Sequence, residues 1–397
     1  MLKERRITVL VTGGIAAYKT CEFVRLLVRQ GADVRVAMTE NATRFVGALT
    51  FEALTGHPVA LTEWAGTDGT IPHIELNRLC DLLVVMPATA NILAKAAQGI
   101  ADDLVSSTLL ARRTPVLFVP AMNRYMWSNP ATQRNVARLR EDGCCFAGPD
   151  EGFQACGDTG AGRMMEPQDV ADLVTGFFQD KILAGRHVLV TAGPTYEAID
   201  DVRGLTNRSS GRQGFEVARA ARNAGARVTL VSGAVALRTP TEVTRINVRS
   251  ALEMHRAVME VLDRDPADVF IGVAAVADWR PLEPLDGKIK KEDGIVPVLR
   301  FVENPDILAD VSARGDVPVT VGFAAEAVDL ENYARKKCRR KGCRMIVGNV
   351  AKEALGSEEN SVLFVTPDST VAFGPAPKSR VAKEIIAHTS RLLNVSQ

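Results

Sequence analysis

The fold is decided by ITVLVTGGIAAYK, residues 7–19, together with a second stretch of the same kind, HVLVTAGPT, at residues 187–195. Each begins with a short apolar run rich in β-branched residues and then turns at glycine, and in the first stretch a helical apolar pattern follows over 16–30. Strands that alternate with helices form parallel sheets. The sequence therefore predicts an α/β protein with two Rossmann-like domains, each an open, mostly parallel sheet flanked by helices.

Further apolar runs extend both halves. Strands are expected at residues 34–38, 82–86 and 116–119 in the first half, and at 228–231, 269–273, 319–323, 345–347 and 362–365 in the second. Helices are expected near 170–178, 215–224 and 331–341. Between the halves, Ala184-Gly185-Arg186 is the best boundary signal. We expect domains at residues 1–184 and 185–397.

Composition narrows the functional classes. The 397 residues are 46% hydrophobic, which rules out a disordered or fibrous protein. Lys plus Arg number 48 and Asp plus Glu 47, so no global field attracts nucleic acid or an anionic membrane. The apolar run after MLKERR is far shorter than the roughly 20 residues of a membrane span. Seven cysteines without CxxC spacing favour reduced thiols and a cytoplasmic location.

Ligands of open parallel sheets bind at the carboxyl ends of the strands. In the first half, the turn at Gly13, Gly14 and Ile15 either cradles a phosphate or simply joins a strand to a helix. The hydroxyl of Thr39 either bonds a phosphate or caps the next helix. The residues alone leave both alternatives open.

One segment in the first half has no regular period. PAMNRYMW, residues 120–127, resembles the PxMNxxMW motif of the homo-oligomeric flavin-containing Cys decarboxylases. PATAN at 87–91 resembles that family's PASANT segment, with Thr89 where Ser is common, and 103–107 resembles its DLVS segment. PHIEL at 72–76 and QACGDTGAGR at 154–163 bring the match closest to the phosphopantothenoylcysteine decarboxylases.

This resemblance implies an FMN enzyme that oxidises the substrate's thiol so that its carboxylate can leave. It implies that His73 takes the thiol proton, that Cys156 returns a proton after decarboxylation, and that Asn123 binds the substrate's carboxylate or amide. Without the family context, each has a structural interpretation: a structural His, an inert buried thiol and a helix-initiating Asn. The glycine-rich segment 150–163 is expected to be a mobile flap over the substrate.

The same resemblance implies where the flavin lies and how the protein assembles. The expected cofactor-binding residues are Gly13, Gly14, Ile15, Thr39, Pro87, Ala88, Thr89, Ser106, Ser107 and Met122. In this family the flavin sits at a subunit boundary and the active-site His reaches a neighbour's flavin. A homo-oligomer built from trimers is therefore implied.

The second half contains a hydroxyl-rich turn, NRSSG at 207–211, which is either an anion cradle or a capped loop. KIKK at 288–291 adds local positive charge. Asn304 is expected to cap a helix whose first residue is Pro305. In the basic helix at 331–341, Lys337 and Lys341 share one face. Such a run is usually solvated, and RNA binding is disfavoured by the near-zero net charge and the lack of interleaved aromatic residues.

These segments resemble the phosphopantothenate–cysteine ligases over residues 186–397. The resemblance implies that 4′-phosphopantothenate is joined to cysteine through an acyl-cytidylate formed from CTP, with Mg²⁺ present and its ligands not identified. Lys288 would steady the triphosphate, and Asn207 would act on the acyl intermediate. The expected nucleotide-binding residues are Ala275, Asp278, Lys288, Asn304, Pro305, Asp306, Ile307, Phe323, Lys337 and Lys341.

The chain departs from the ligase pattern at several positions. Tyr196 replaces the usual Arg, Asp201 the usual Pro and Gly204 the usual aromatic residue. Arg212 and Gln213 replace the common Lys-Met. These changes affect substrate affinity and loop geometry, and they spare the residues with expected chemical roles.

The sequence thus predicts a bifunctional enzyme whose second half makes the substrate of its first. Two alternatives are less consistent with the sequence. A two-domain nicotinamide oxidoreductase is disfavoured because neither glycine turn is GxGxxG. A flavin-binding regulatory subunit without decarboxylase turnover is disfavoured because both His73 and Cys156 are present.

Overall fold

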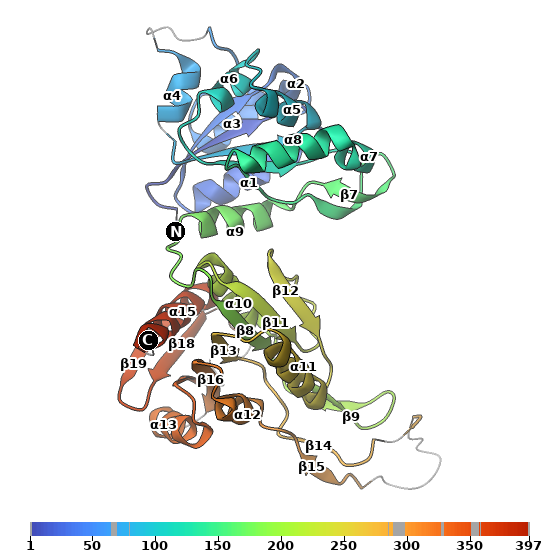
Figure 1. The fold of residues 1–397 in the computed structure, drawn as a ribbon, viewed down its shortest axis with the longest axis vertical. Helices are drawn as coiled ribbons and strands as arrows, with labels where there is room; N and C mark the ends of the chain where they lie inside the picture. Colours follow the sequence, from blue (N-terminus) through green and yellow to red (C-terminus); the bar gives the residue numbers. More distant parts are fainter. Residues whose placement is uncertain are drawn as a thin grey trace. The chain divides into compact units, whose positions relative to one another are not determined.

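The computed structural model describes residues 2–64, 70–78, 80–284, 286–288, 298–326, 329–350, 357 and 359–395. The chain divides into two compact units, Met1–Phe178 and Gln179–Gln397, so the division falls slightly before the expected residue 184. Each unit is an α/β domain in which helices flank a β-sheet (Figure 1), and the predicted fold class is confirmed.

The first unit is built on a five-stranded parallel sheet in the order β2-β1-β3-β4-β5. The strands are β1 (Arg6–Val11), β2 (Asp33–Met38), β3 (Leu82–Ala88), β4 (Val116–Pro120) and β5 (Cys145–Phe146). In the centre, Val9 pairs with Val36 on one side and Val84 on the other. The winding reverses between β1 and β3, which places a ligand crevice at the carboxyl ends of these strands.

Helices cover both faces of this sheet because successive strand residues point to opposite sides. Ile7, Val9 and Val11 pack in one cluster with α1 and α9, while Leu10 and Leu83 pack in another with α4, α5, α6 and α8. The helices are α1 (Ala17–Arg29), α2 (Glu40–Thr43), α3 (Ala48–Thr55), α4 (Pro72–Arg78), α5 (Ala90–Gln98), α6 (Leu104–Leu110), α7 (Arg124–Ser128), α8 (Pro130–Glu141) and α9 (Pro167–Phe177).

The glycine-rich segment after β5 is an antiparallel hairpin of β6 (Asp150–Phe153) and β7 (Thr159–Arg163). Gly162 has a φ of +126°, and a Cβ on it would lie 2.4 Å from the carbonyl oxygen of Met122. Glycine is therefore required where the hairpin presses against the loop that carries Asn123.

The second unit has an eight-stranded sheet in the order β12-β11-β8-β13-β16-β17-β18-β19. It is parallel as far as β17, and its last two strands are antiparallel. The strands are β8 (His187–Ala192), β11 (Arg227–Ser232), β12 (Val243–Asn247), β13 (Val269–Gly272), β16 (Val319–Glu326), β17 (Met345–Val350), β18 (Glu359–Val365) and β19 (Thr370–Pro377). The winding reverses between β8 and β13, so a second crevice is expected there.

Five helices and two small hairpins complete the described part of this unit. The helices are α10 (Arg212–Asn223), α11 (Ala251–Arg264), α12 (Ile307–Arg314), α13 (Leu330–Lys341) and α15 (Lys378–Val395). The hairpins pair β9 (Tyr196–Ala198) with β10 (Gly204–Thr206) and β14 (Trp279–Pro281) with β15 (Phe301–Glu303). Within the described residues, no helix is long and apolar enough to cross a membrane.

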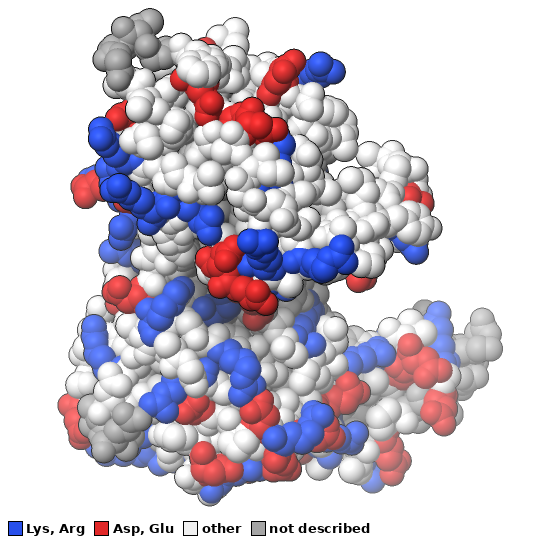
Figure 2. All heavy atoms as spheres, turned by 45° about the horizontal axis from the view of Figure 1, so that its top comes forward, with Lys and Arg blue, Asp and Glu red and all other residues white. Residues whose placement is uncertain are grey.

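Charge is mixed on the face drawn in Figure 2, where Lys and Arg alternate with Asp and Glu on both units. This distribution agrees with the net charge of +1. Ligand charge must therefore be met by groups within particular pockets rather than by a broad field.

Candidate functional site

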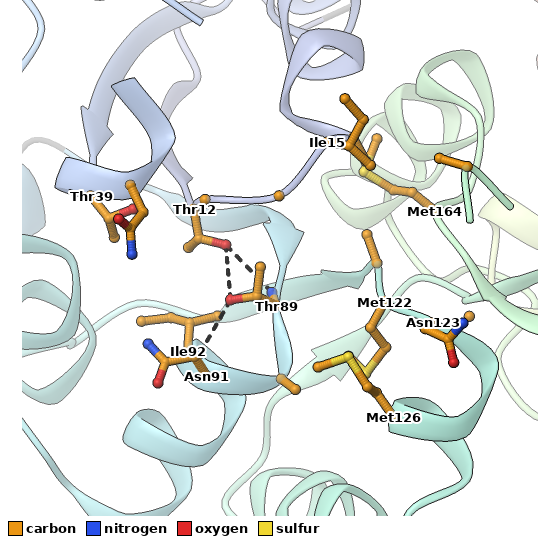
Figure 3. Close-up of a pocket in the computed structure, with 18 of the residues that line it drawn as sticks. Thr12, Ile15, Thr39, Thr89, Asn91, Ile92, Met122, Asn123, Met126 and Met164 are labelled. Atoms are coloured by element: carbon orange, nitrogen blue, oxygen red, sulfur yellow. Dashed lines mark hydrogen bonds between the residues drawn. The ribbon is translucent and has the colours of Figure 1, made fainter. Parts of the chain in front are cut away.

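The first unit has a cleft of about 1360 Å³ at the carboxyl ends of its strands. Figure 3 shows residues from β1, β3 and the loop after β4 converging on it, among them Thr12, Thr89 and Met122. The cleft lies at the point where the winding of the sheet reverses, which is where open α/β sheets bind their ligands.

Threonine hydroxyls form a network across the floor of the cleft. The Thr12 Oγ1 donates to the Pro87 carbonyl oxygen at 2.6 Å and lies 3.3 Å from the Thr89 Oγ1. Thr89 caps α5 by accepting from the Ile92 amide at 3.4 Å (Figure 3), and Thr39 caps α2 in the same way. Both capping threonines also line the cleft, so the helix-cap interpretation of Thr39 does not exclude contact with a ligand.

The glycine turn brings backbone close to the cleft. A Cβ on Gly13 would lie 2.4 Å from the Cβ of Asn41, and one on Gly14 would lie 3.4 Å from the Thr89 methyl carbon. Only a residue without a side chain leaves this space. Backbone N–H groups next to hydroxyls are suited to the phosphate of a ligand.

The structure separates the expected flavin contacts into two groups. Those that line the cleft are Gly13, Gly14, Ile15, Thr39, Thr89 and Met122. Pro87 and Ala88 are buried at the end of β3 beneath it. Ser106 is not among the lining residues: it is 1% exposed, and its hydroxyl and amide complete a capping box with Asp103. Ser107 is not among the lining residues either.

Asn123 and Cys156 meet in the cleft although 33 positions separate them. The Asn123 Nδ2 donates to the Cys156 Sγ at 3.1 Å and to the Asp158 Oδ2 at 2.7 Å. Its Oδ1 accepts from the Tyr125 amide at 2.8 Å and so caps α7. The amide therefore performs the structural role and faces the thiol at the same time.

His73 does not join this group. It lies on α4, which Figure 1 places on the opposite side of the unit from α7, and it is not among the residues lining the cleft. Its Nδ1 is buried, makes no hydrogen bond and lies 3.6 Å from the Glu63 Oε1. Within one chain, the structure therefore does not bring His73 into the cleft that holds Cys156.

A first group of charged side chains lies at the rim of the cleft, and no sequence motif indicates it. The Lys19 Nζ lies 3.0 Å from the Glu166 Oε1, and Arg163 pairs with the same carboxylate. Burial opposes ionisation of Glu166, but hydrogen bonds from Lys19 and Arg163 outweigh it and lower the pKa of the carboxyl group. The 147 positions between Lys19 and Glu166 left no local pattern that could have indicated the pair.

A second group involves Lys95, whose Nζ lies 2.6 Å from the Asp102 Oδ1 and 2.8 Å from the Asp103 Oδ2. Burial alone would raise the pKa of Asp103, but hydrogen bonds from Lys95 and Ser106 lower it below its usual value. All three residues in this group line the cleft. The single Lys95 ammonium therefore compensates about half of the negative charge of this group.

In the second unit, a pocket of about 390 Å³ lies where β13 and β16 end. The Lys337 Nζ donates to the Phe323 carbonyl oxygen at 2.8 Å, and Lys341 forms an ion pair with Asp306. The expected nucleotide residues that line this pocket are Asp278, Asn304, Pro305, Asp306, Ile307, Phe323, Lys337 and Lys341. Both lysines that share a face of α13 thus reach one pocket.

The expected helix start at Asn304 was wrong. The N-cap of α12 is Asp306, whose Oδ1 accepts from the Ala309 amide at 3.1 Å, and the helix begins at Ile307. The side chain of Asn304 is used elsewhere, because its Nδ2 donates to the Ala277 carbonyl oxygen at 2.8 Å. This contact ties the Asn-Pro turn to the loop after β13.

Asn207 lines a neighbouring pocket of about 640 Å³ together with Tyr196 and Arg249. Its Nδ2 donates to the Ala275 carbonyl oxygen at 3.0 Å, so Ala275 contacts Asn207 through its backbone and does not line the Lys337 pocket. The segment 274–278 therefore lines the Lys337 pocket, and through the Ala275 carbonyl it also holds Asn207 of the neighbouring pocket.

Lys288 is exposed and lines neither pocket. It follows Gly287, whose amide donates to the Asp201 Oδ2 at 3.0 Å. Asp201, one of the departures from the family pattern, thus anchors the loop that carries Lys288. Residues 289–291 of the KIKK segment lie outside the described residues.

Two other departures compensate for each other. A Cβ on Gly204 would lie 2.4 Å from the Tyr196 Cζ, so the Tyr196 ring occupies the space of a side chain at position 204. The guanidinium carbon of Arg249 lies 4.5 Å from the centre of that ring. Gln213 donates to the Lys378 carbonyl oxygen at 3.2 Å, and Arg212 is the first residue of α10.

Metal ligation is not evident from protein groups alone. Across the described ranges, no group of three or more His, Cys, Asp or Glu side chains could hold a metal ion. Asp278 and Asp306 are carboxylates that line the Lys337 pocket. Mg²⁺ commonly uses one or two carboxylates together with substrate phosphates.

Two family models match the chain. Residues 1–179 match the model described as Flavoprotein, and residues 183–392 match that of the DNA/pantothenate metabolism flavoprotein C-terminal domain. The chain resembles the coenzyme A biosynthesis bifunctional protein CoaBC of Vibrio parahaemolyticus at 44% identity, covering 99% of each chain. It resembles the protein of the same name from Bacillus subtilis at 44%, covering 93% of this chain and 92% of that one.

Solved structures match each half. The C-terminal domain of a CoaBC protein is 37% identical, with a TM-score of 0.47, and covers 54% of this chain and 100% of its own. A PPC decarboxylase mutant complexed with pantothenoylaminoethenethiol is 31% identical, with a TM-score of 0.41, and covers 44% of this chain and 99% of its own.

The fold, the strand-end cleft and the matched families define a two-domain α/β flavoprotein. The chain belongs to the CoaBC family of bifunctional coenzyme A biosynthesis proteins. The predicted family is thereby confirmed, as is the predicted enzyme class, a phosphopantothenoylcysteine decarboxylase joined to a phosphopantothenate–cysteine ligase. Membership decides against the nicotinamide oxidoreductase.

Proposed function

We propose that the second unit joins 4′-phosphopantothenate to cysteine at the expense of CTP, and that the first unit decarboxylates the product to 4′-phosphopantetheine with FMN. The order of the domains is then the reverse of the order of the reactions. The observation that carries the decarboxylase assignment is the contact between Asn123 and Cys156 inside the strand-end cleft.

FMN is the flavin that fits this cleft. Backbone at Gly13 and Gly14 and the hydroxyls of Thr39 and Thr89 would hold its phosphate, while Met122 would face the ring system. When bound, FMN supplies an acceptor for a hydride from the substrate and later returns it. The matched flavoprotein family supports this choice.

The side chains then have separate tasks. The Asn123 amide binds the substrate's carboxylate and orients it for departure. The Cys156 thiol gives a proton to the carbon that has lost carbon dioxide. The hairpin of β6 and β7 carries Cys156 and shields the reactive product from water. At the start of the reaction, His73 of a neighbouring subunit accepts the proton of the substrate's thiol.

In the ligase unit, Lys337 and Lys341 contact the phosphates, and Phe323 and Asp278 line the nucleotide site. Lys288 steadies the triphosphate, and Mg²⁺ neutralises further charge. Asn207 acts on the acyl-cytidylate from the adjoining pocket, where it is held by the Ala275 carbonyl. Activation of the carboxylate needs alignment and charge neutralisation rather than a nucleophilic side chain.

We propose a homo-oligomer built from trimers. Large apolar side chains are exposed around the cleft, with Ile15 60%, Tyr18 59% and Phe153 68% exposed. Such a surface favours burial against another subunit. The separation of His73 from the cleft supports the same assembly. We also propose a cytoplasmic location, supported by seven cysteines that are all free thiols.

One experiment tests both reactions. Purified protein is incubated with 4′-phosphopantothenate, cysteine, Mg²⁺ and each nucleoside triphosphate in turn, and the products are identified by mass. We expect pyrophosphate, carbon dioxide and 4′-phosphopantetheine with CTP. A yellow protein that makes the ligated product but releases no carbon dioxide would favour the regulatory-subunit alternative.

Matched variants assign the steps. Cys156→Ser should still release carbon dioxide but fail to release reduced product. Lys288→Gln should suppress CTP-dependent pyrophosphate release, and Asn207→Asp should let the acyl-cytidylate accumulate. Each variant changes one unit only, so the reaction of the unchanged unit serves as its control. Wild-type rates in any of the three would reject that residue's role.

A further inference from the structure

Both N–H donors of the Asn123 amide are used in the cleft. Its Oδ1 accepts from the Tyr125 amide, which fixes the orientation of the side chain. Its two N–H bonds then point to the Cys156 Sγ at 3.1 Å and the Asp158 Oδ2 at 2.7 Å. A substrate carboxylate can therefore bind this amide only by displacing one of these partners.

Asp158 is the partner that resembles the substrate's own group. It presents a carboxylate, and its Oδ2 also lies 3.5 Å from the Cys156 Sγ. The contacts described for the Asp158 carboxylate are with the Asn123 amide and the Cys156 thiol, both of which are uncharged groups. Two carboxylates at one amide donor repel each other, so Asp158 and the substrate's carboxylate exclude one another.

Cys156 and Asp158 are held in one hydrogen-bonded turn. Both lie on the tight turn between β6 and β7, where the Gln154 amide donates to the Asp158 carbonyl at 2.8 Å and the Gly157 amide to the Gln154 carbonyl at 2.9 Å. We infer that a movement of this turn that removes the Asp158 carboxylate from Asn123 withdraws the Cys156 thiol as well.

We propose that Asp158 is a positioning residue that competes with the substrate's carboxylate for the Asn123 amide and so times the approach of the Cys156 thiol. This proposal rests on the proposed decarboxylase function. While the substrate's carboxylate is bound to Asn123, the turn that carries Cys156 and Asp158 stays away from Asn123. Once carbon dioxide has left, Asp158 returns to Asn123 and brings the acid to the carbon that needs a proton.

The step balances in atoms and charge. Breaking the carbon–carbon bond releases carbon dioxide and leaves its electron pair on the substrate as an enethiolate. That carbon then forms a C–H bond with the proton from the Cys156 S–H, and the resulting thiolate regains a proton from water. The two electrons removed from the substrate at the start return to it in the established FMN reaction.

The test compares Asp158→Ala with wild type in steady-state turnover of phosphopantothenoylcysteine. Removing the competitor should lower KM about three- to tenfold, as expected when a ligand no longer displaces a charged hydrogen bond. Carbon dioxide release should continue, while reduced product per carbon dioxide falls about tenfold or more because the acid is no longer delivered. Asp158→Glu, which keeps the charge, should recover part of both quantities.

A matched control lies on the same hairpin. Glu151 is an exposed carboxylate of β6 outside the cleft, and Glu151→Ala should behave as wild type. A purely structural role for Asp158 would raise KM and lower both products together, and that result would overturn the proposal. Wild-type KM and product ratio in Asp158→Ala would do the same.

The two levels of inference fail differently. If wild-type protein binds no flavin and releases no carbon dioxide, the proposed function itself is wrong. If wild type turns over normally and Cys156→Ser accumulates the enethiol, but Asp158→Ala is indistinguishable from wild type, only the role of Asp158 is rejected.

Discussion

At the scale of single residues, several polar side chains of the decarboxylase cleft serve two purposes. Asn123 caps α7 with its oxygen and faces Cys156 with its nitrogen. Thr39 and Thr89 cap helices and also line the cleft. The sequence pattern set a structural interpretation of Asn123 and Thr39 against a functional one, but an amide or a hydroxyl has separate donor and acceptor sites and permits both.

What the motifs could not supply is the identity of each side chain's partner. Ser106 matched a family segment, yet its hydroxyl is consumed by the capping box with Asp103. Asp158 was quoted within a motif without a role, because only the folded hairpin brings it to Asn123. Residue types near a site could therefore be predicted, while contacts between distant segments could not.

Gly13→Ala should abolish tight flavin binding. The added Cβ would lie 2.4 Å from the Asn41 Cβ, so the turn must move away from the position in which its backbone meets the phosphate. We expect flavin affinity to fall by about tenfold or more, the scale of one lost charged hydrogen bond. Absorbance of purified protein titrated with FMN measures this change.

Gly47→Ala is the matched control for that substitution. Nothing lies within 4 Å of a Cβ built there, and its φ of −68° suits any residue. It should leave flavin binding unchanged. Equal flavin content in the Gly13 variant and the control would show that the turn does not hold the phosphate.

At the scale of elements, the regular strands were the most predictable part. The runs at 7–11 and 187–190 became β1 and β8, because continuous apolar runs suit strands buried on both faces. The hairpin of β9 and β10 was not foreseen, since three-residue strands show no period. The start of α12 was misplaced because both Asn304 and Asp306 are suitable caps, and a tertiary contact claimed Asn304.

Asp103→Ala should destabilise the first unit through α6. The variant loses the cap to the Ser106 amide and leaves Lys95 with one acidic partner fewer. Loss of such a cap typically costs about 1 kcal/mol. Urea unfolding followed by circular dichroism at neutral pH measures the difference. The release of flavin identifies the transition that belongs to the first unit.

The same variant has a pH signature. The folded-state pKa of Asp103 is lowered, so its ionised form stabilises the fold above the unfolded-state pKa of about 3.9. This contribution disappears as the pH falls through the lower folded-state pKa. The difference in the free energy of unfolding between wild type and Asp103→Ala should therefore become smaller on acidification. A difference that stays constant down to pH 3 would contradict the assignment.

At the scale of the whole molecule, the position of His73 matters most. It lies on α4, away from the cleft that holds Cys156. If each flavin site takes His73 from a neighbour and Cys156 from its own chain, two inactive variants can complement each other. Co-expressing His73→Asn with Cys156→Ala should restore roughly one quarter of wild-type turnover, the random share of sites with both residues intact.

The control is co-expression of His73→Asn with the double variant, which offers no site with both residues intact and should stay inactive. Reduced product formed per flavin is the quantity to compare. Complementation no greater than that control would mean that both residues act within one chain, and the proposed assembly would then have to be abandoned.

The exchange at Tyr196 and Gly204 bears on how this sequence could have arisen. Because the phenol ring fills the room above the glycine, an ancestor with an aromatic residue at 204 could not accept Tyr196 first without a collision. If the aromatic residue at 204 is replaced by a small residue first, Tyr196 can then be accepted without a collision. The two sites are thus epistatic, and mutational histories that pass through the small residue are the accessible ones.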